Sequence, residues 1–470
     1  MKKIKLWVFI SIIMSLAFMS AECPQGAEAR IRGGAPYFIT NNFAEDSSTA
    51  FIVQWHNDKN VPAQALQIVE ENESFESSNT RTIIVRGILW NPSRTPKDRD
   101  VGEYTPRNIF RTEVTGLTPD TKYKYRIGTP KGWSETFYHL TSGGSNANFS
   151  FTVGADTQDD RFNQMRSTFR AANEFDADNR FFLIAGDISD YPQENPNEFP
   201  NFTNAANEFN IRTPVIAIQG NHDTYLNSNE SNRDEYMFGS AEVFNSFITF
   251  PENGWDQGED HGPHRSKSYY FYYNNVLFIM LNSMATFNET GTREPIHTAQ
   301  ARWLEEVLQK DKDNKLSKYI VIVKHVPFFA GRGSSNNGEP WLIASARAAY
   351  GKIISDFDVD IVFFGHDHVY TRSNAIKIGT NTALTDINFN NVRNGTVYSI
   401  AGSIGPKIYT FRNPAGTTNQ FIPISYPVRT DQQAPGVFVN VKVTNEKLTV
   451  TARRLGAEAP LDMYEVLAKR

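Results

Sequence analysis

Val215 to Asp223 reads Val-Ile-Ala-Ile-Gln-Gly-Asn-His-Asp, an apolar run that ends in a glycine and then in three side chains able to bind metal. A short run of branched apolar residues bounded by glycine predicts a buried β-strand. In open sheets flanked by helices, ligands bind outside the carboxyl ends of the strands. The stretch therefore predicts an α/β domain whose chemistry lies where this strand ends.

Apolar runs alternate with segments that can form helices on both sides of this stretch. Further apolar runs are Phe149 to Ala155, Phe181 to Ala185, Val276 to Leu281, Tyr319 to Val323 and Val359 to Phe364. Segments that can form helices are Arg161 to Phe175, Phe202 to Phe209 and Thr298 to Lys310. Strands that are apolar throughout are covered on both faces, so the pattern predicts buried sheet flanked by helices. Gly436 to Arg454 predicts a hairpin that turns at Asn445-Glu446 and closes the second sheet.

The residues before this domain predict strands without helices. Ala50 to Trp55 and Arg81 to Arg86 are rich in β-branched and aromatic residues. Leu117 to Tyr123 reads Leu-Thr-Pro-Asp-Thr-Lys-Tyr, which looks like the corner of a fibronectin type III sandwich, where a tyrosine bonds back to the backbone. An ordinary turn before an ordinary strand explains the same residues. Ser142 to Asn146 then reads as a linker.

The start of the chain predicts a cleaved export signal. Lysines precede an apolar run from Leu6 to Met19, and Ala27-Glu28-Ala29 supplies a cleavage site. The run is shorter than the roughly 20 residues that a membrane-spanning helix needs. We therefore expect a bacterial protein that is secreted or held in the cell envelope. The only cysteine, Cys23, precedes the cut, so the mature chain has neither disulfides nor thiolate ligands.

The length and net charge of the chain limit its possible domain organisation and binding partners. The 470 residues exceed one ordinary core, and we expect a signal peptide at 1–29, a β-sandwich at 30–143, a catalytic domain at 148–430 and completing strands at 431–470. The net charge is −5 and no long basic run occurs, so nothing indicates binding to nucleic acid or to an anionic membrane. No membrane span is expected after signal cleavage.

Metal-capable side chains follow five of six predicted strands. They are Asp156, Asp187, Asn221-His222-Asp223, His325 and His366-Asp367-His368. Each alone has an ordinary structural explanation, such as a helix cap or a packed histidine, but together they form a set. Two cations about 3.5–4 Å apart need a bridging carboxylate, and imidazoles and an amide oxygen can complete their shells. The sequence therefore predicts a binuclear metal site.

These blocks, in this order, resemble the calcineurin-like metallophosphoesterase superfamily. The sandwich ahead of them, the stretch from Ser268 to Ser283 and the Gln300-x-x-Trp303-Leu304 helix resemble its purple acid phosphatase branch. The resemblance extends from about residue 36 to the end of the chain. It implies a multidomain fold, with a fibronectin type III-like β-sandwich followed by a four-layer αββα catalytic domain. It also implies two metal ions, drawn from Mn, Fe and Zn.

The resemblance also implies residue roles. Asp187 bridges the metals, Asp156 and His368 bind the first ion, and Asn221, His325 and His366 bind the second. Asn221 and His222 contact the substrate, and His222 protonates or stabilises the leaving group. Asp223 is expected to orient that imidazole by a hydrogen bond.

Two positions depart from the family pattern. The purple branch has a tyrosine three residues after the bridging aspartate, but here Asp190 stands there and Tyr191 follows it. The wider superfamily has a histidine two residues after the first aspartate, where this chain has Gln158. The remaining ligand of the first metal is thus Gln158, Asp190 or Tyr191. We favour Gln158, whose amide oxygen suits a divalent ion such as Mn²⁺, and we expect no purple colour.

The predicted function is hydrolysis of small phosphomonoesters by a metal-activated hydroxide. A phosphodiesterase or nucleotidase is the first alternative, because loops such as 225–240, 252–267 and 331–339 select the substrate around a common site. A secreted binding protein that works through its sandwich is the second. Among other polar residues, Arg332 is interpreted as exposed rather than phosphate-binding. His261, His264 and His297 are interpreted as surface or core residues.

Overall fold

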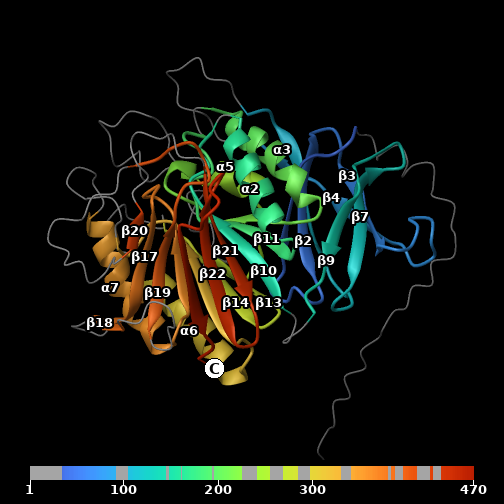
Figure 1. Cartoon of the computed structure of the whole chain (residues 1–470). Helices are drawn as coiled ribbons and strands as arrows, with labels where there is room; N and C mark the ends of the chain where they lie inside the picture. The colour runs from blue at the N-terminus through green and yellow to red at the C-terminus, as the bar shows by residue number, and fades with distance from the viewer. Residues whose placement is uncertain are drawn as a thin grey trace, which may run out of the picture.

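The computed structural model describes residues 34–91, 104–143, 148–159, 161–192, 195–224, 241–254, 268–283, 297–329, 340–378, 383–386, 395–409, 424–426 and 436–469 (Figure 1). The predicted signal peptide at 1–29 and most of the three loops at 225–240, 252–267 and 331–339 lie outside these ranges. Within them, no helix has the length and apolar character needed to cross a membrane.

Two facing sheets form the N-terminal domain. One sheet has the order β1-β2-β6-β5, with β1 at Tyr37–Phe43, β2 at Phe51–Asp58, β6 at Arg107–Val114 and β5 at Ile88–Trp90. The other has β4 at Arg81–Arg86, β3 at Ala63–Glu70, β7 at Lys122–Thr129 and β8 at Gly132–Trp133 in that order, and β9 at Phe137–Leu140 also pairs with β7. The predicted β-sandwich is therefore present, and its strands lie within the expected 30–143.

Aromatic residues fill the core of this sandwich. Trp55 and Phe110 stack with ring centroids 5.4 Å apart, and the indole of Trp55 donates a 2.7 Å hydrogen bond to Gln64 Oε1. At the predicted corner, the backbone N–H of Thr118 donates a 3.0 Å hydrogen bond to the hydroxyl of Tyr123. The tyrosine thus bonds back to the chain just before its own strand.

Two more sheets form the predicted catalytic domain. The first has the order β12-β11-β10-β21-β22-β23, and the second the order β13-β14-β15-β16-β19-β17-β18, with β20 paired to β17. The strands of the first are Phe149–Gly154 (β10), Asn179–Ile184 (β11), Val215–Ala217 (β12), Val437–Val443 (β21), Lys447–Arg454 (β22) and Asp462–Leu467 (β23). Those of the second are Tyr269–Tyr273 (β13), Val276–Leu281 (β14), Tyr319–Lys324 (β15), Ile361–Phe364 (β16), Tyr370–Ile378 (β17), Ala383–Asp386 (β18), Thr396–Ala401 (β19) and Ile424–Tyr426 (β20).

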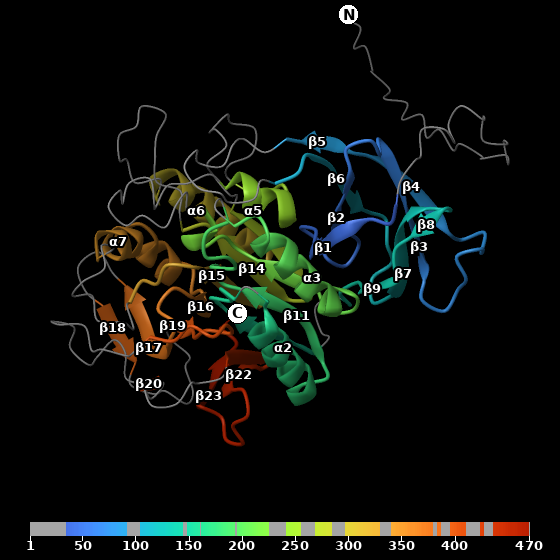
Figure 2. The same ribbon diagram turned by 90° about the horizontal axis from the view of Figure 1, so that it is seen from above.

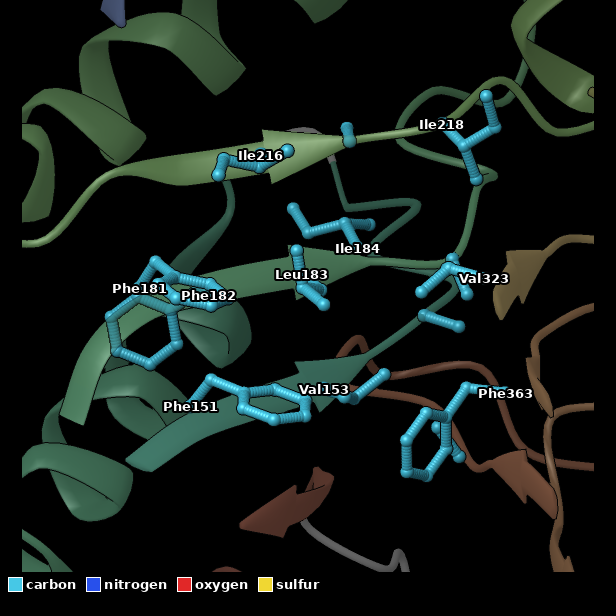
Figure 3. Packing of buried hydrophobic residues seen from close by; sticks show 14 of the residues in the cluster. Phe151, Val153, Phe181, Phe182, Leu183, Ile184, Ile216, Ile218, Val323 and Phe363 are labelled. Carbon is cyan, nitrogen blue, oxygen red and sulfur yellow. The ribbon is translucent and has the colours of Figure 1, made fainter. Parts of the chain in front are cut away.

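Alternation along the strands explains the four layers. In β14, Phe278 faces a core shared with the first sheet, whereas Leu277 and Ile279 face a second core on the other side. Figure 3 shows Phe151 and Val153 of β10 in the shared core, with Val323 and Phe363 of the second sheet on its opposite wall. Helices close the two outer faces, so the αββα architecture is confirmed.

The helices are assigned to these faces by their contacts. The first sheet is covered by α2 at Asn163–Phe175 and α3 at Glu198–Asn210. The second core is covered by α6 at His297–Asn314 and α7 at Pro340–Asp356. The described residues also form the short helix α5 at Glu242–Phe247 and the 3₁₀ turn η1 at His222–Thr224.

The C-terminal hairpin joins a different sheet from the one expected. β21 and β22 pair with each other around the predicted turn, but β21 pairs with β10 of the first sheet (Figure 1). The prediction that the hairpin closes the second sheet was therefore wrong. A hairpin pattern specifies the partner within the hairpin, whereas the next strand along is chosen by tertiary packing.

The sandwich is bonded directly to the catalytic domain. The side-chain amide of Asn42 donates a 2.7 Å hydrogen bond to the carbonyl of Thr249, and that of Gln54 donates one of 2.7 Å to the carbonyl of Ser246. Phe43 of β1 belongs to the hydrophobic core of the catalytic domain. Figure 2 shows the sandwich against the side of the catalytic domain that carries α3 and α5.

Candidate metal centre

Five strands deliver side chains to one edge of the two sheets. Asp156 follows β10, Asp187 follows β11, Asn221 follows β12, His325 follows β15, and His366 and His368 follow β16. Asp156, Asp187, His366 and His368 have φ between +51° and +73°, where residues other than glycine are uncommon. Such backbone strain concentrates at functional sites because the surrounding structure must enforce it.

The acidic and imidazole groups form two clusters with one member in common. Asp187, His325 and His366 place one ligand-type atom each within 4.8 Å of one another, and so do Asp156, Asp187 and His368. Asn221 Oδ1 lies 2.8 Å from His325 Nε2 and 2.9 Å from His366 Nδ1. The arrangement has the form of two adjoining ligand sets that share a carboxylate.

The charges of this site fit cations. Asp156 and Asp187 are fully buried, and burial together with the charge of Asp187 raises the pKa of Asp156 well above its usual value. Oδ2 of Asp156 is buried and has no hydrogen-bond partner in the described part of the chain. A buried carboxylate oxygen without a donor is costly unless a cation compensates it. The donor set and its unpaired oxygen therefore suit a pair of metal ions.

Glycines leave the space that these side chains occupy. A Cβ on Gly220 would lie 2.2 Å from Asp187 Oδ1, and a Cβ on Gly186 would lie 2.5 Å from His325 Nδ1. Gly186 also has a φ of +84°. The glycines in the Gly-Asp and Gly-Asn-His-Asp blocks are thus required by close approach, and Gly186 by backbone conformation as well.

The three candidates for the remaining first-metal ligand differ in their surroundings. Gln158 is buried beside Asp187, with its amide nitrogen 3.4 Å from Asp187 Oδ2, and its Oε1 has no hydrogen-bond partner among the described residues. The carboxylate of Asp190 instead forms an ion pair with Lys407. The ring of Tyr191 packs edge-on against His222 at 5.7 Å between centroids.

Asp223 makes contacts different from those expected. Its Oδ1 accepts hydrogen bonds from the backbone of Ile188 and Ser189, and its Oδ2 accepts from the backbone of Asp187 and Gly220, at 2.8–3.1 Å. Both oxygens therefore hold the turn after β11. Burial, with the charge of Asp187, raises the pKa of Asp223 to about 8.

The imidazole of His222 is contacted by Asp190 instead. His222 Nδ1 lies 3.0 Å from the carbonyl oxygen of Asp190 and 3.4 Å from its carboxylate. The predicted pairing of Asp223 with His222 is thus corrected, because adjacent residues in a tight turn point to different sides. Burial lowers the pKa of His222, whereas the charges of Asp187 and Asp190 oppose that shift.

Sequence reasoning missed two residues of this region. Lys407 pairs with Asp190, and its carbonyl oxygen lies 3.1 Å from Nδ1 of His368. Glu198 accepts hydrogen bonds from the backbone N–H groups of Asp190 and Tyr191. An acidic residue in the first turn of α3 was a usable signal for Glu198, whereas nothing near Lys407 in sequence indicated its place. Arg332, His261, His264 and the side chain of His297 lie outside the described residues.

Comparison with known families agrees with this architecture. The purple acid phosphatase N-terminal domain model matches residues 36–141, and the calcineurin-like phosphoesterase model matches residues 149–370. The resemblance predicted from the sequence is confirmed.

Curated relatives and solved structures agree as well. Fe(3+)-Zn(2+) purple acid phosphatase 12 of Arabidopsis thaliana is 25% identical over 284 residues, covering 58% of this chain and 54% of the relative. Acid phosphatase type 7 of Mus musculus is 23% identical over 275 residues, covering 56% of each. The chain thus spans about half the length of these relatives. The structure of a purple acid phosphatase from yellow lupin seeds superposes with a TM-score of 0.72 at 15% identity, over 92% of this chain and 74% of that one, which shows a shared fold.

Proposed function

We propose that this chain, which joins a purple acid phosphatase N-terminal domain to a calcineurin-like phosphoesterase domain, hydrolyses phosphate esters with the help of two metal ions. One observation carries the proposal. The carboxylate of Asp187 belongs to both clusters of ligand-type atoms, as a bridge between two cations requires. The name of one relative, Fe(3+)-Zn(2+) purple acid phosphatase 12, agrees with it.

The ligand roles follow from the two clusters. Asp156, His368 and the amide oxygen of Gln158 would hold the first ion, and Asn221, His325 and His366 the second, with Asp187 between them. Nδ1 of His325 lies 2.7 Å from the carbonyl oxygen of Ala185, which orients its Nε2 towards Asp187 and Asn221. Such support from a second partner fixes the ring and tautomer of a histidine ligand.

Gln158 is the best of the three candidates for the last ligand. Its buried Oε1 has no hydrogen-bond partner among the described residues, whereas the carboxylate of Asp190 is paired with Lys407. A neutral amide oxygen favours a hard divalent ion over a ferric ion held by phenolate. We therefore propose Mn²⁺, Zn²⁺ or Fe²⁺ at this position and a colourless protein.

The chain's own groups account for the remaining chemistry. When bound, the ions would supply positive charge for the phosphate oxygens and lower the pKa of a water molecule. His222 lies beside the bridging carboxylate and donates its backbone N–H to Asp187 Oδ1 at 2.8 Å. From there its imidazole would give a proton to the departing alkoxide oxygen. Asp190 would hold that imidazole through Nδ1.

Phosphomonoesters are the proposed substrates, with diesters or nucleotides as the alternative. The acid phosphatase names of the relatives support monoesters. The loops that would discriminate between these substrates lie largely outside the described residues. The proposed location is outside the cytoplasm, as a secreted or cell-envelope protein. It is supported by the predicted signal peptide at residues 1–29.

The test measures metal content, visible absorption and aryl phosphate hydrolysis on one preparation, before and after chelation. We expect two ions per chain, hydrolysis that chelation abolishes and Mn²⁺ or Zn²⁺ restores, and no charge-transfer band. An aryl phosphodiester run in parallel separates the two substrate classes. No bound metal and no hydrolysis across a panel of ions would reject the enzyme and favour the binding protein.

A further inference from the structure

A cavity lies between the two domains, away from the metal centre. It has a volume of about 250 Å³ and adjoins an open depression that shares Glu71, Lys122, Leu140 and Arg180 with it. The sandwich contributes residues of β7 and β9, and the catalytic domain contributes the residues that lead into β11 and β12. β9 lies on the side of the sandwich that faces the catalytic domain (Figures 1 and 2).

Cationic side chains dominate the inner cavity. Lys122, Arg180 and Arg212 line it, and Glu71 is the one carboxylate among its lining residues. Glu71 already has a partner, because Arg212 lies 3.4 Å from it and stacks over the ring of Tyr138 at 3.8 Å. Lys122 has no ion pair with any described residue. The positive charges of Lys122 and Arg180 are therefore the ones left to attract a ligand.

Arg180 is only loosely held by protein groups. Its guanidinium lies 3.7 Å from Asp178, beyond hydrogen-bonding distance, and Asp178 itself is largely exposed to solvent. The outer depression adds Glu70 and Asp120 to its walls. A ligand would therefore direct its negative group inward, and a highly charged anion would be repelled at the entrance.

Two neutral polar side chains also belong to the cavity wall, and one of them has a buried atom without a partner among the described residues. His139 is only 4% exposed, and its Nε2 is buried with no hydrogen-bond partner among the described residues. Tyr273 also lines the cavity, where burial raises the pKa of its hydroxyl and the nearby charge of Arg180 opposes that shift. Buried polar groups without partners are rare in native proteins and call for an explanation such as a ligand.

The cavity and the metal centre lie at opposite ends of the same strands. Asn179 and Arg180 begin β11, and Asp187 follows its other end, about 20 Å away at the usual rise per residue. Thr213 and Pro214 likewise precede β12, and Asn221 follows it. A ligand in the cavity would thus touch the starts of two strands that carry residues of the metal centre.

We infer that this interdomain cavity binds a small oxyanion, either a phosphate or a carboxylate, at a second site separate from the metal centre. Lys122 and Arg180 would contact the anionic oxygens, and His139 and Tyr273 would donate hydrogen bonds within the cavity. Its size suits a small metabolite rather than a nucleotide or a peptide.

The test is calorimetric titration of the metal-loaded protein with orthophosphate and, separately, with succinate. Orthophosphate should bind at one site in addition to the metal centre, or succinate at one site alone, and the two arms distinguish the source of the oxyanion. Lys122→Met and Arg180→Met keep the apolar stem of each side chain and should each weaken this binding about tenfold. Lys131→Met, an exposed lysine of the same domain, is the matched control.

Hydrolysis serves as an independent readout. Inhibition of turnover by orthophosphate at the metal centre should keep its inhibition constant in Lys122→Met, because this residue does not contact that centre. Titration reports on the cavity even if the chain proves to have no hydrolytic activity. The inference is overturned if neither anion binds saturably outside the metal centre, or if Lys122→Met and Arg180→Met bind it as well as Lys131→Met does.

Discussion

The two halves of the metal centre differ in how many of their buried polar atoms have hydrogen-bond partners within the protein. In the half formed by Asn221, His325 and His366, the side chains lie within hydrogen-bonding distance of one another and of the backbone. In the half formed by Asp156, Gln158 and His368, Asp156 Oδ2 and Gln158 Oε1 are buried, and no described residue gives either atom a hydrogen bond. The half proposed for the first metal would therefore depend more on its ion, and it is also the half that departs from the family pattern.

The difference between the two halves indicates at which metal position a change of ion is tolerated. A half whose ligands support one another retains its geometry without metal, because its hydrogen bonds persist. A half with unpaired buried oxygens gains more from the ion, and its ligand chemistry determines which ion is preferred. Asp187 belongs to both halves, so substitutions there and on either side should separate their contributions.

Asp187→Asn should affect both halves of the metal centre and have the largest effect on metal content and turnover. The amide cannot bridge two cations as a carboxylate does, so we expect loss of both ions and a fall in turnover of at least about 1,000-fold. Metal analysis and aryl phosphate hydrolysis on the same sample measure both. Asp178→Asn, at an exposed site, is the control. Two retained ions in Asp187→Asn would contradict the bridging role.

Gln158→Ala should affect the first-metal half alone. We expect affinity for one of the two ions to fall about 10- to 100-fold, with the other ion retained. Competition with a chelator, followed by metal analysis, resolves the two ions, and the exposed Gln309→Ala provides the control. Equal loss of both ions, or unchanged affinity, would return Asp190 and Tyr191 to consideration.

Asp190→Asn should leave both metal ions bound and slow the transfer of a proton from His222 to the leaving group. We expect turnover to fall about tenfold for alkyl phosphates, whose leaving groups need a proton, and little for aryl phosphates with acidic leaving groups. A series of esters of graded leaving-group acidity measures this dependence. A uniform decrease across the series, or loss of metal, would indicate a purely structural role.

The smallest expected effect is a pH dependence of the metal-free protein. Burial raises the pKa of Asp223 to about 8 and that of Asp156 well above its usual value, so the folded state holds these protons more tightly than the unfolded state. Metal-free stability should therefore fall as pH rises from 7 to 9. Thermal unfolding measures this slope.

The metal-loaded protein is the control for that slope. Bound cations offset the repulsion between the carboxylates, so the decrease in unfolding temperature from pH 7 to 9 should be smaller with metal. An equal slope with and without metal would mean that the buried carboxylates are not relieved by cations. The lowered pKa of Asp187 acts only below about pH 4 and does not enter this window.

Local sequence was sufficient for much of the fold. The apolar runs before Asp187 and His325 predicted buried strands, and Tyr123 was placed correctly at a sandwich corner. These features depend on residues close together in the chain, where strand pattern and turn chemistry act directly. The sheet that receives β21 was predicted wrongly, because strand partners far apart in sequence are selected by packing.

The candidate site was likewise predicted only in part from the sequence. Which side chains stand at strand ends could be read from order and spacing, because parallel strands deliver their carboxyl ends to one edge. Which of them touch could not, and Asp190 rather than Asp223 proved to lie against His222. Lys407 reaches Asp190 from more than 200 residues away, and only the folded chain brings those charges together. The sequence thus determines which side chains are available for chemistry. Which of them contact one another depends on side-chain directions that only the tertiary structure sets.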